Sequence, residues 1–218
     1  MPAAVLWDMD GTIVDTEPYW MAAETALVES FGGVWTHDDG LSLVGSSMWH
    51  SARVLRSRGV DLPEDEIIAT LSARVGEQLR TQIPWRPGAR ELLVALREAG
   101  IPTALVTMSV RSLAELVVEA IPFDAFDAII SGDDVEHGKP HPEAYLSGAA
   151  ALGVDVTDCV AIEDSEPGLA SAVASGAVSI GVPHVISLLE GDGHTLWESL
   201  HGRTVADLVE VFSKGRTS

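Results

Sequence analysis

Apolar residues follow two different periods along this chain, and the period changes near residue 84. From about residue 15 to residue 83 they recur every three or four positions, which is the spacing of amphipathic helices. The first helix of this segment is expected to begin near Pro18, with Thr16 as its cap, and to end at Gly32. Two more helices are predicted over about residues 47–58 and 63–79. The segment contains no convincing strand and is predicted to be wholly helical.

Short apolar runs of strand length lie on both sides of this segment. One covers residues 3–7, and after residue 84 such runs alternate with helical stretches of about ten residues. The predicted strands cover residues 101–106, 127–130, 159–162 and 177–182, and the predicted helices cover residues 89–99, 110–121, 142–152 and 166–175. Residues 196–212 are expected to close the chain as another strand or helix. This alternation indicates right-handed βαβ units in a parallel, doubly wound sheet.

The two patterns together predict an α/β protein with two domains. A Rossmann-like core is expected from residues 1–15 and 84–218, and an all-helical cap domain from the inserted residues 16–83. The chain would cross between the two domains near Asp15 and near Ile83, and these crossings would act as hinges.

Charge and composition narrow the range of partners. The 218 residues carry a formal net charge of −20, which would repel nucleic acids and anionic membrane surfaces, so neither is expected as a partner. No apolar stretch approaches the roughly 20 residues of a membrane span, and the chain starts on a predicted strand, unlike a signal peptide. The lone Cys159 excludes an internal disulfide and is expected to be a buried thiol. We therefore predict a cytoplasmic protein, and we expect a monomer.

Polar residues that could do chemistry follow the predicted strands at the point where each strand ends. They are Asp8, Asp10 and Thr12, then Thr107 and Ser109, then Asp133, Asp134, His137 and Lys139, and finally Glu163, Asp164 and Ser165. The carboxyl ends of parallel strands meet at one edge of a sheet, where open α/β sheets bind their ligands. Carboxylates crowded there repel one another unless a cation lies among them, and oxygen ligands of this kind suit Mg²⁺. The sequence therefore predicts Mg²⁺ on Asp8 and Asp164, beside a phosphate that the hydroxyls and Lys139 help to bind.

Four of these fragments, taken in order, resemble the motifs of a known group, the haloacid dehalogenase superfamily. They are Asp8-Met9-Asp10-Gly11-Thr12, Thr107, Gly138-Lys139-Pro140 and Glu163-Asp164-Ser165. The resemblance spans nearly the whole chain, including the helical insertion after the first motif. It is nearest to the β-phosphoglucomutase-like and sugar-phosphatase branch, which shares the form Asp15-Thr16-Glu17-Pro18.

The resemblance implies a role for each residue of the motifs. Asp8 would attack phosphorus and form an aspartyl-phosphate, and Asp10 would serve first as general acid and then as general base. Thr107 would bind phosphoryl oxygens, and Lys139 would hold both Asp8 and the phosphate. Mg²⁺ would be bound by Asp8, the backbone carbonyl of Asp10, Asp164 and, directly or through water, Glu163.

Other residues of the same loops are expected to support this chemistry. Gly11 would permit a tight turn that, together with Thr12, brings backbone N–H groups to the phosphate. Ser109 is expected either to bind the phosphate or to cap the helix that follows it. Loop-shaping or solvated positions are expected for three further residues, Asp133, Asp134 and His137.

Two departures from the mutases of this branch favour hydrolysis. Trp20 stands where a histidine is expected, and Met48 stands where an arginine would bind a second phosphate. No lysine occurs between residues 15 and 83, which argues against a phosphonate hydrolase. We therefore predict hydrolysis of a small phosphorylated metabolite, because such a cap would close over the site and exclude polymers. The enzyme's choice among phosphate monoesters is expected to depend on five residues of the cap: Trp20, Met48, Trp49, His50 and Arg53. The alternative role for the two tryptophans is helix packing.

Besides a non-catalytic binding protein, two alternatives stay open at this point. The first is a phosphosugar mutase of the β-phosphoglucomutase type. The second is a receiver-like signalling module, since receiver domains also place acids, a threonine and a lysine at a sheet edge and are phosphorylated on aspartate. The spacing of Asp8 and Asp10 and the long helical insertion both disfavour a receiver. Steady release of phosphate would distinguish an enzyme from a module that is phosphorylated once.

Overall fold

Six parallel strands form one sheet in the computed structural model, which describes residues 1–191 and 193–215. The strand order is β3-β2-β1-β4-β5-β6, so the chain leaves β1 toward one edge and later returns to the other side. The strands are β1 (Ala4–Trp7), β2 (Thr103–Val106), β3 (Ala128–Ile130), β4 (Cys159–Glu163), β5 (Val178–Gly181) and β6 (His194–Leu196). The predicted doubly wound parallel sheet is confirmed, and its switch point lies between β1 and β4.

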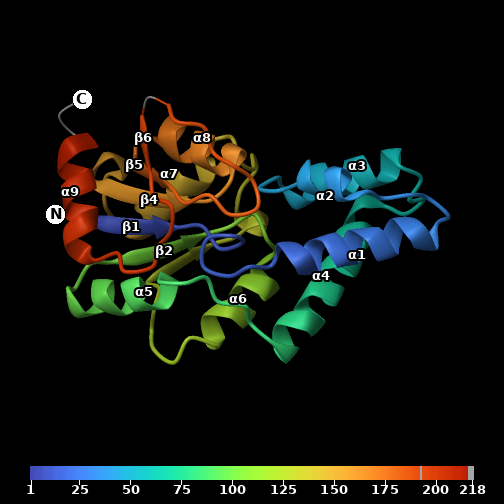
Figure 1. Ribbon diagram of the computed structural model, residues 1–218, viewed down its shortest axis with the longest axis horizontal. Helices are drawn as coiled ribbons and strands as arrows, with labels where there is room; N and C mark the ends of the chain where they lie inside the picture. Colours follow the sequence, from blue (N-terminus) through green and yellow to red (C-terminus); the bar gives the residue numbers. More distant parts are fainter. Residues whose placement is uncertain (192, 216–218) are drawn as a thin grey trace.

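Helices cover both faces of the sheet (Figure 1). One face is packed by α5 (Ala89–Glu98), α6 (Arg111–Glu119) and α9 (Val205–Gly215), and the other by α7 (Glu143–Ala151) and α8 (Glu166–Ser175). Along β1, Val5 and Trp7 belong to the first core and Leu6 belongs to the second, and all three are fully buried. A strand buried on both faces needs apolar residues at every position, which explains the continuous apolar run at residues 3–7.

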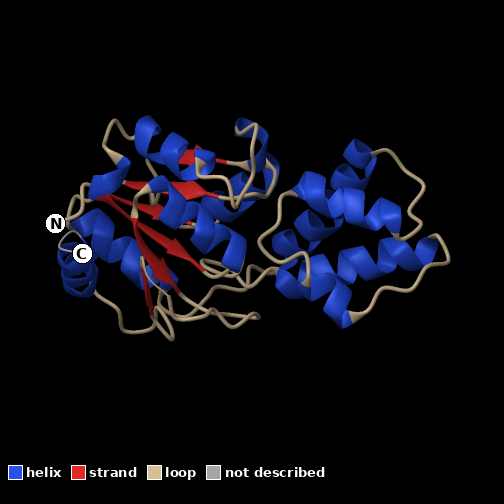
Figure 2. Ribbon diagram, turned by 90° about the horizontal axis from the view of Figure 1, so that it is seen from above, coloured by secondary structure: helices blue, strands red, loops and turns tan. Residues whose placement is uncertain are grey.

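The remaining helices lie together beyond the carboxyl ends of the strands (Figure 2). They are α1 (Glu17–Ser30), α2 (His37–Leu41), α3 (Met48–Ser57) and α4 (Glu64–Thr81). Their apolar stripes meet in one core that includes Leu27, Leu55 and Leu71, each at most 2% exposed. The inserted, all-helical cap is thus confirmed, whereas its boundaries at residues 16 and 83 remain a prediction. Helix α2 was not predicted, because five residues are too few to show a helical period.

The two chain crossings between core and cap lie side by side. The backbone N–H of Asp15 donates to the carbonyl of Pro84 over 2.7 Å, and that of Arg86 donates to the carbonyl of Ile13 over 2.8 Å. Val14 and Trp85 form an antiparallel bridge between these two bonds. Any movement of the cap therefore has to bend both crossings together.

The end of the chain differs from the single element expected over residues 196–212. Strand β6 begins before that range, ends at its first residue, Leu196, and pairs with β5, and α9 begins only at Val205. In β6, Thr195 is exposed and its two neighbours are partly buried, and three residues are too few for a strand period to show in the sequence. Cys159 is fully buried, as expected. Among the described residues, no helix is both long enough and apolar enough to cross a membrane.

Candidate active site

The predicted site residues come together at the carboxyl ends of β1, β2 and β4. Asp8 follows β1 directly, Thr107 follows β2, and Asp164 follows β4. The loop after β3 brings Lys139 to the same place, because its ammonium reaches back to Asp8. β1 lies between β2 and β4, so its acids occupy the middle of the sheet edge. This is the position at which open α/β sheets bind ligands.

Lys139 is a buried lysine that joins two acids. Its Nζ lies 2.7 Å from Oδ1 of Asp8 and 2.5 Å from Oε1 of Glu163, and it also donates to the carbonyl of Val106 over 3.0 Å. The side chain is 2% exposed. Burial alone would lower the pKa of Lys139, but the carboxylates of Asp8 and Glu163 outweigh it and raise that pKa above its usual value. Lys139 therefore carries a permanent positive charge beside Asp8.

Glu163 has all its hydrogen-bonding capacity engaged within the protein. Oε1 accepts from Lys139 and from the hydroxyl of Tyr145 at 2.7 Å. Oε2 accepts from the backbone N–H of Asp164 and from Oγ of Ser165, both at 3.2 Å. Four donors fill the lone pairs of one carboxylate, so the geometry assigns Glu163 to holding Lys139. Metal ligation by Glu163 remains a prediction.

Asp8 and Asp164 are the two acids that these contacts leave most in need of a cation. Burial and the carboxylate of Glu163 raise the pKa of Asp8 to about 7, against the opposing charge of Lys139. Burial and the neighbouring Asp8 also raise the pKa of Asp164 well above its usual range. Oδ2 of Asp8 is buried without a hydrogen-bond partner among the described residues. Three buried acids lie close enough to ligate one metal ion: Asp8, Glu163 and Asp164.

The turn after β1 is shaped by the approach of Asp164. Gly11 has a φ of 81°, and a Cβ built on it would lie 2.0 Å from Oδ2 of Asp164. Only glycine fits there, as the predicted tight turn requires. The N–H of Gly11 is donated to the carbonyl of Val14 over 2.7 Å, within the turn itself and not toward a phosphate. Oγ1 of Thr12 reaches Oδ1 of Asp164 at 3.4 Å, so Thr12 supports the acid.

Asp10 is surrounded by four donors from two parts of the chain. From the cap side, Oδ1 accepts from Oγ1 of Thr16 at 2.5 Å and from Nε1 of Trp20 at 3.2 Å. From the loop after β2, Oδ2 accepts from Oγ1 of Thr107 at 3.2 Å and from Oγ of Ser109 at 2.8 Å. The carboxylate therefore bridges cap and core, and its four donors do not include Lys139.

These bonds change the expectations for three residues. Thr16 is at the N-cap of α1, but its side chain makes no capping bond and serves Asp10. Ser109 caps no helix, because the N-cap of α6 is Val110. Trp20 is more than a packing residue, since its indole N–H binds the acid. The importance of Thr16 to Asp10 was missed because six residues separate them and only the fold brings them together.

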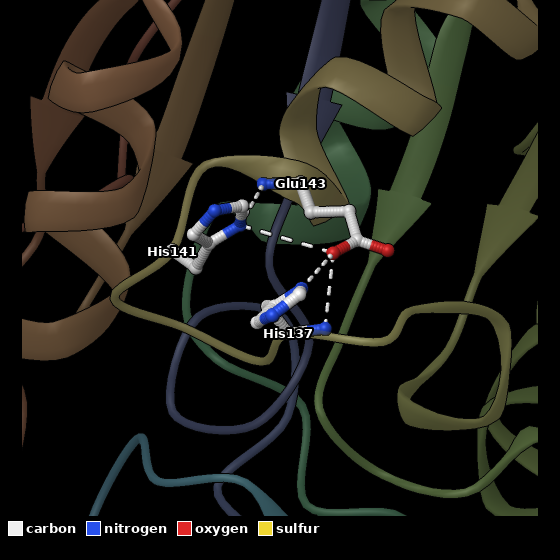
Figure 3. A group of neighbouring side chains, drawn as sticks. All are labelled: His137, His141 and Glu143. Atoms are coloured by element: carbon white, nitrogen blue, oxygen red, sulfur yellow. Dashed lines mark hydrogen bonds and ion pairs between the residues drawn. The ribbon is translucent and has the colours of Figure 1, made fainter.

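A surface cluster of His137, His141 and Glu143 holds the loop that carries Lys139 (Figure 3). The carboxylate of Glu143 accepts from the backbone N–H groups of Glu136 at 2.8 Å and His137 at 3.0 Å, and from Nδ1 of His137 at 3.0 Å. Nδ1 of His141 accepts from the backbone N–H of Glu143 at 3.3 Å. His137 is solvated, as expected, and these bonds tie both ends of the loop. Asp133 and Asp134 bind Arg111 nearby and shape the same loop.

The cap covers the site with a mixed set of residues. Trp20 and Met48 line the cavity above Asp8, and their binding of substrate remains a prediction, whereas Trp49, His50 and Arg53 line a neighbouring groove over the loop of Lys139. Two acids of α1 that were not predicted also line the cavity, Glu17 and Glu24. A sequence signal for them existed, because they lie seven positions apart on the face that carries the apolar stripe of α1.

Comparison with known proteins agrees with this geometry. A family model described as haloacid dehalogenase-like hydrolase matches residues 2–176. This chain belongs to the haloacid dehalogenase-like hydrolases. Members of this family generally use a metal ion, and the buried acids at the carboxyl ends of β1 and β4 form a group that could hold one.

Several characterised members of the family are similar over most of their length. Hexitol phosphatase B of Escherichia coli is 32% identical over 188 residues, which cover 83% of each chain. Fructose-1-phosphate phosphatase YqaB of Escherichia coli is 29% identical over 182 residues, or 83% of this chain and 96% of the relative. A structure of CbbY from Rhodobacter sphaeroides with xylulose-1,5-bisphosphate aligns at 28% identity with a TM-score of 0.86, covering 95% of this chain and 99% of that chain. The resemblance to the sugar-phosphatase branch is thus confirmed.

The fold is also shared with a mutase. β-Phosphoglucomutase from Clostridium difficile aligns with a TM-score of 0.84 at 23% identity and covers both chains completely. At this identity the similarity shows the fold alone, so the choice between hydrolysis and phosphoryl transfer to a second sugar rests on the site.

Proposed function

We propose that this protein is a Mg²⁺-dependent phosphatase that hydrolyses a small sugar-phosphate monoester through an aspartyl-phosphate on Asp8. The observation that carries the proposal is the separation of two acids in one site. The ammonium of Lys139 donates to the buried Asp8, whereas Asp10 is bound by four other donors. One acid is thus placed to attack and the other to move a proton. The hexitol and fructose-1-phosphate phosphatases support this function over a mutase or a receiver-like module.

The chemistry takes place in two steps on these residues. A carboxylate oxygen of Asp8 forms a bond to phosphorus while the ester P–O bond breaks, and the leaving oxygen takes a proton from Asp10. Asp10 then removes a proton from water, whose oxygen attacks the aspartyl-phosphate and releases phosphate and free Asp8. The hydroxyls of Thr107 and Ser109 suit both steps, because they can donate to an ionised Asp10 and accept from a protonated one.

The metal is inferred from the donor set of the site. Buried carboxylate oxygens with raised pKa values are hard ligands in need of positive charge, which is the chemistry that Mg²⁺ satisfies. Asp8, Asp164 and the backbone carbonyl of Asp10 would hold it, and Thr12 and Gly11 would position Asp164. A bound Mg²⁺ would offset the repulsion between these acids and a dianionic phosphate.

The cap argues against a bisphosphate intermediate, which a phosphosugar mutase must retain. Met48 lines the cavity where a cation would be needed, and Lys139, the one cation among the described lining residues, is engaged by Asp8 and Glu163. The same proposal places the cap at residues 16–83 and takes a small phosphorylated metabolite as the partner. It also includes a cytoplasmic location and a monomeric state.

The test is a screen of sugar and polyol phosphates with purified protein and Mg²⁺, in which the release of inorganic phosphate is measured. We expect many turnovers per enzyme, abolished in Asp8→Asn and by a chelator. A single turnover that leaves a stable phosphoprotein would favour the receiver-like module. Transfer of phosphate to a second position of the sugar, without release, would favour a mutase.

A further inference from the structure

The wall of the cavity that faces the phosphoryl site carries two buried acids from the cap. Glu17 is 7% exposed and Glu24 is 5% exposed, and both belong to α1, with Trp20 between them. The same cavity is lined by Asp8 and Lys139, so the two acids share one space with the reacting groups. Acids are rarely buried without a partner or a task. Neither acid has a part in the chemistry of Asp8 and Asp10.

The two acids lie at different depths. They are seven residues apart, which is about 10 Å along a helix axis. Glu24 is held at the far end, where its Oε2 accepts from Nε1 of Trp35 at 3.2 Å. Gly40 of α2 adds no side chain beside it, and a Cβ there would lie 3.6 Å from Oε2 of Glu24. An extended chain of carbon atoms that begins at the phosphate would pass Glu17 before it reaches Glu24.

The charges of the cavity select against a second anion. Burial, followed by the nearby Asp10, raises the pKa of Glu17 to about 8, and burial raises the pKa of Glu24 to about 7. Carboxyl groups in either protonation state bind hydroxyls, because the ionised form accepts and the neutral form also donates. Among the described lining residues no arginine or histidine and no lysine besides Lys139 faces these acids. A second phosphate or a carboxylate would find no cation besides Lys139, which Asp8 and Glu163 already engage.

We propose that Glu17 and Glu24 form a hydroxyl-binding subsite, so that the substrate is an uncharged polyhydroxy chain, a sugar or sugar alcohol, with a single phosphate. This inference rests on the proposed function and adds the class of substrate to it. Glu17 binds a hydroxyl near the phosphate and Glu24 binds one farther along the chain. Bisphosphates and phosphorylated carboxylic acids are rejected by the same two residues.

The experiment compares three kinds of substrate with four forms of the protein. The substrates are fructose 1-phosphate, fructose 1,6-bisphosphate and acetyl phosphate, which has no hydroxyl to reach the subsite. The proteins are the wild type, Glu17→Gln, Glu24→Gln and the control Glu29→Gln, which removes the same charge from an exposed position of α1. We expect each subsite variant to reduce the preference in kcat/KM for the monophosphate over the bisphosphate by about tenfold or more, and the control to leave it unchanged.

Separate outcomes bear on the inference and on the function. If the wild type hydrolyses acetyl phosphate and both subsite variants keep the wild-type preference, the subsite is overturned and the phosphatase stands. A wild type that prefers the bisphosphate would overturn the subsite in the same way. If the wild type with Mg²⁺ hydrolyses none of the three, the proposed function fails and the subsite fails with it. Melting temperatures of all four proteins verify that the variants are folded.

Discussion

Nζ of Lys139 donates a hydrogen bond to Oε1 of Glu163 over 2.5 Å, so the acid beside Asp164 is turned toward the lysine. Tyr145 donates to the same oxygen over 2.7 Å and fixes its direction. Two neighbouring acids at the end of β4 therefore have different partners. Asp164 faces the turn at Gly11, where we propose the metal site, and Glu163 contacts the lysine that binds Asp8.

This division predicts different responses to Mg²⁺ at the two acids. We expect Glu163→Gln to lower kcat by about 10–100-fold, because a positioning contact is weakened, with little change in the Mg²⁺ concentration for half-maximal rate. Asp164→Asn should instead raise that concentration strongly, because a ligand is lost. Phosphate release measured against Mg²⁺ concentration separates the two effects. Equal shifts in both variants would show that Glu163 also ligates the metal.

A second prediction tests Asp10 as the proton donor. Asp10→Asn should lower kcat/KM for a sugar phosphate by about 10²–10⁴-fold, because the leaving alkoxide then receives no proton. The loss should be much smaller with p-nitrophenyl phosphate, whose leaving group needs no proton. Rates of the variant on both substrates, relative to the wild type, give the comparison. An equal loss of kcat/KM on both, which reports the step that forms the aspartyl-phosphate, would mean that Asp10 is not the proton donor.

A third prediction concerns the contact between Gly11 and Asp164. Gly11→Ala places a Cβ 2.0 Å from a buried carboxylate oxygen and also strains a φ of 81°. We expect a loss of about 3 kcal/mol or more in the free energy of unfolding. We also expect weaker Mg²⁺ binding, seen as a higher Mg²⁺ concentration for half-maximal rate. The matched control is Gly32→Ala, where φ is 78° and nothing lies within 4 Å. It should lose only about 1 kcal/mol, the cost of the backbone strain. Urea denaturation of both variants tests the difference.

A fourth prediction follows from the raised pKa of Glu24. Burial raises that pKa from 4.5 to about 7, so between these values the unfolded chain has lost a proton that the folded chain keeps. Unfolding then releases a proton, and the stability that Glu24 contributes falls as the pH rises from about 4.5 to about 7. Glu24→Gln removes this effect. The free energy of unfolding of the variant minus that of the wild type should therefore grow by up to about 3 kcal/mol from pH 5 to pH 8.

The control for this fourth prediction is again Glu29→Gln, because Glu29 is exposed on the same helix. Its free energy of unfolding should follow the wild type at both pH values. A pH-independent difference between Glu24→Gln and the wild type would mean that Glu24 is ionised in the folded protein throughout this range.

The sequence determined the fold class through its two periods. Continuous apolar runs such as residues 3–7 mark strands buried on both faces, and these alternated with helices at the spacing of a parallel sheet. The motifs at the strand ends then had to meet at one edge, whatever the details of packing. The short elements α2 and β6 were not predicted, since they have too few residues for a period to appear.

Tertiary structure decided what each polar side chain is for. The sequence places Glu163 beside Asp164 and Thr16 at the start of a helix, which suggests a ligand and a cap. Hydrogen bonds depend on distance and direction in the folded chain. Glu163 therefore binds Lys139 and Thr16 binds Asp10, each from another segment. The burial of Glu17 and Glu24 likewise arises only when α1 packs over the site. Chain-local patterns therefore determined the fold and the candidate reacting groups, whereas long-range contacts decided how those groups are held.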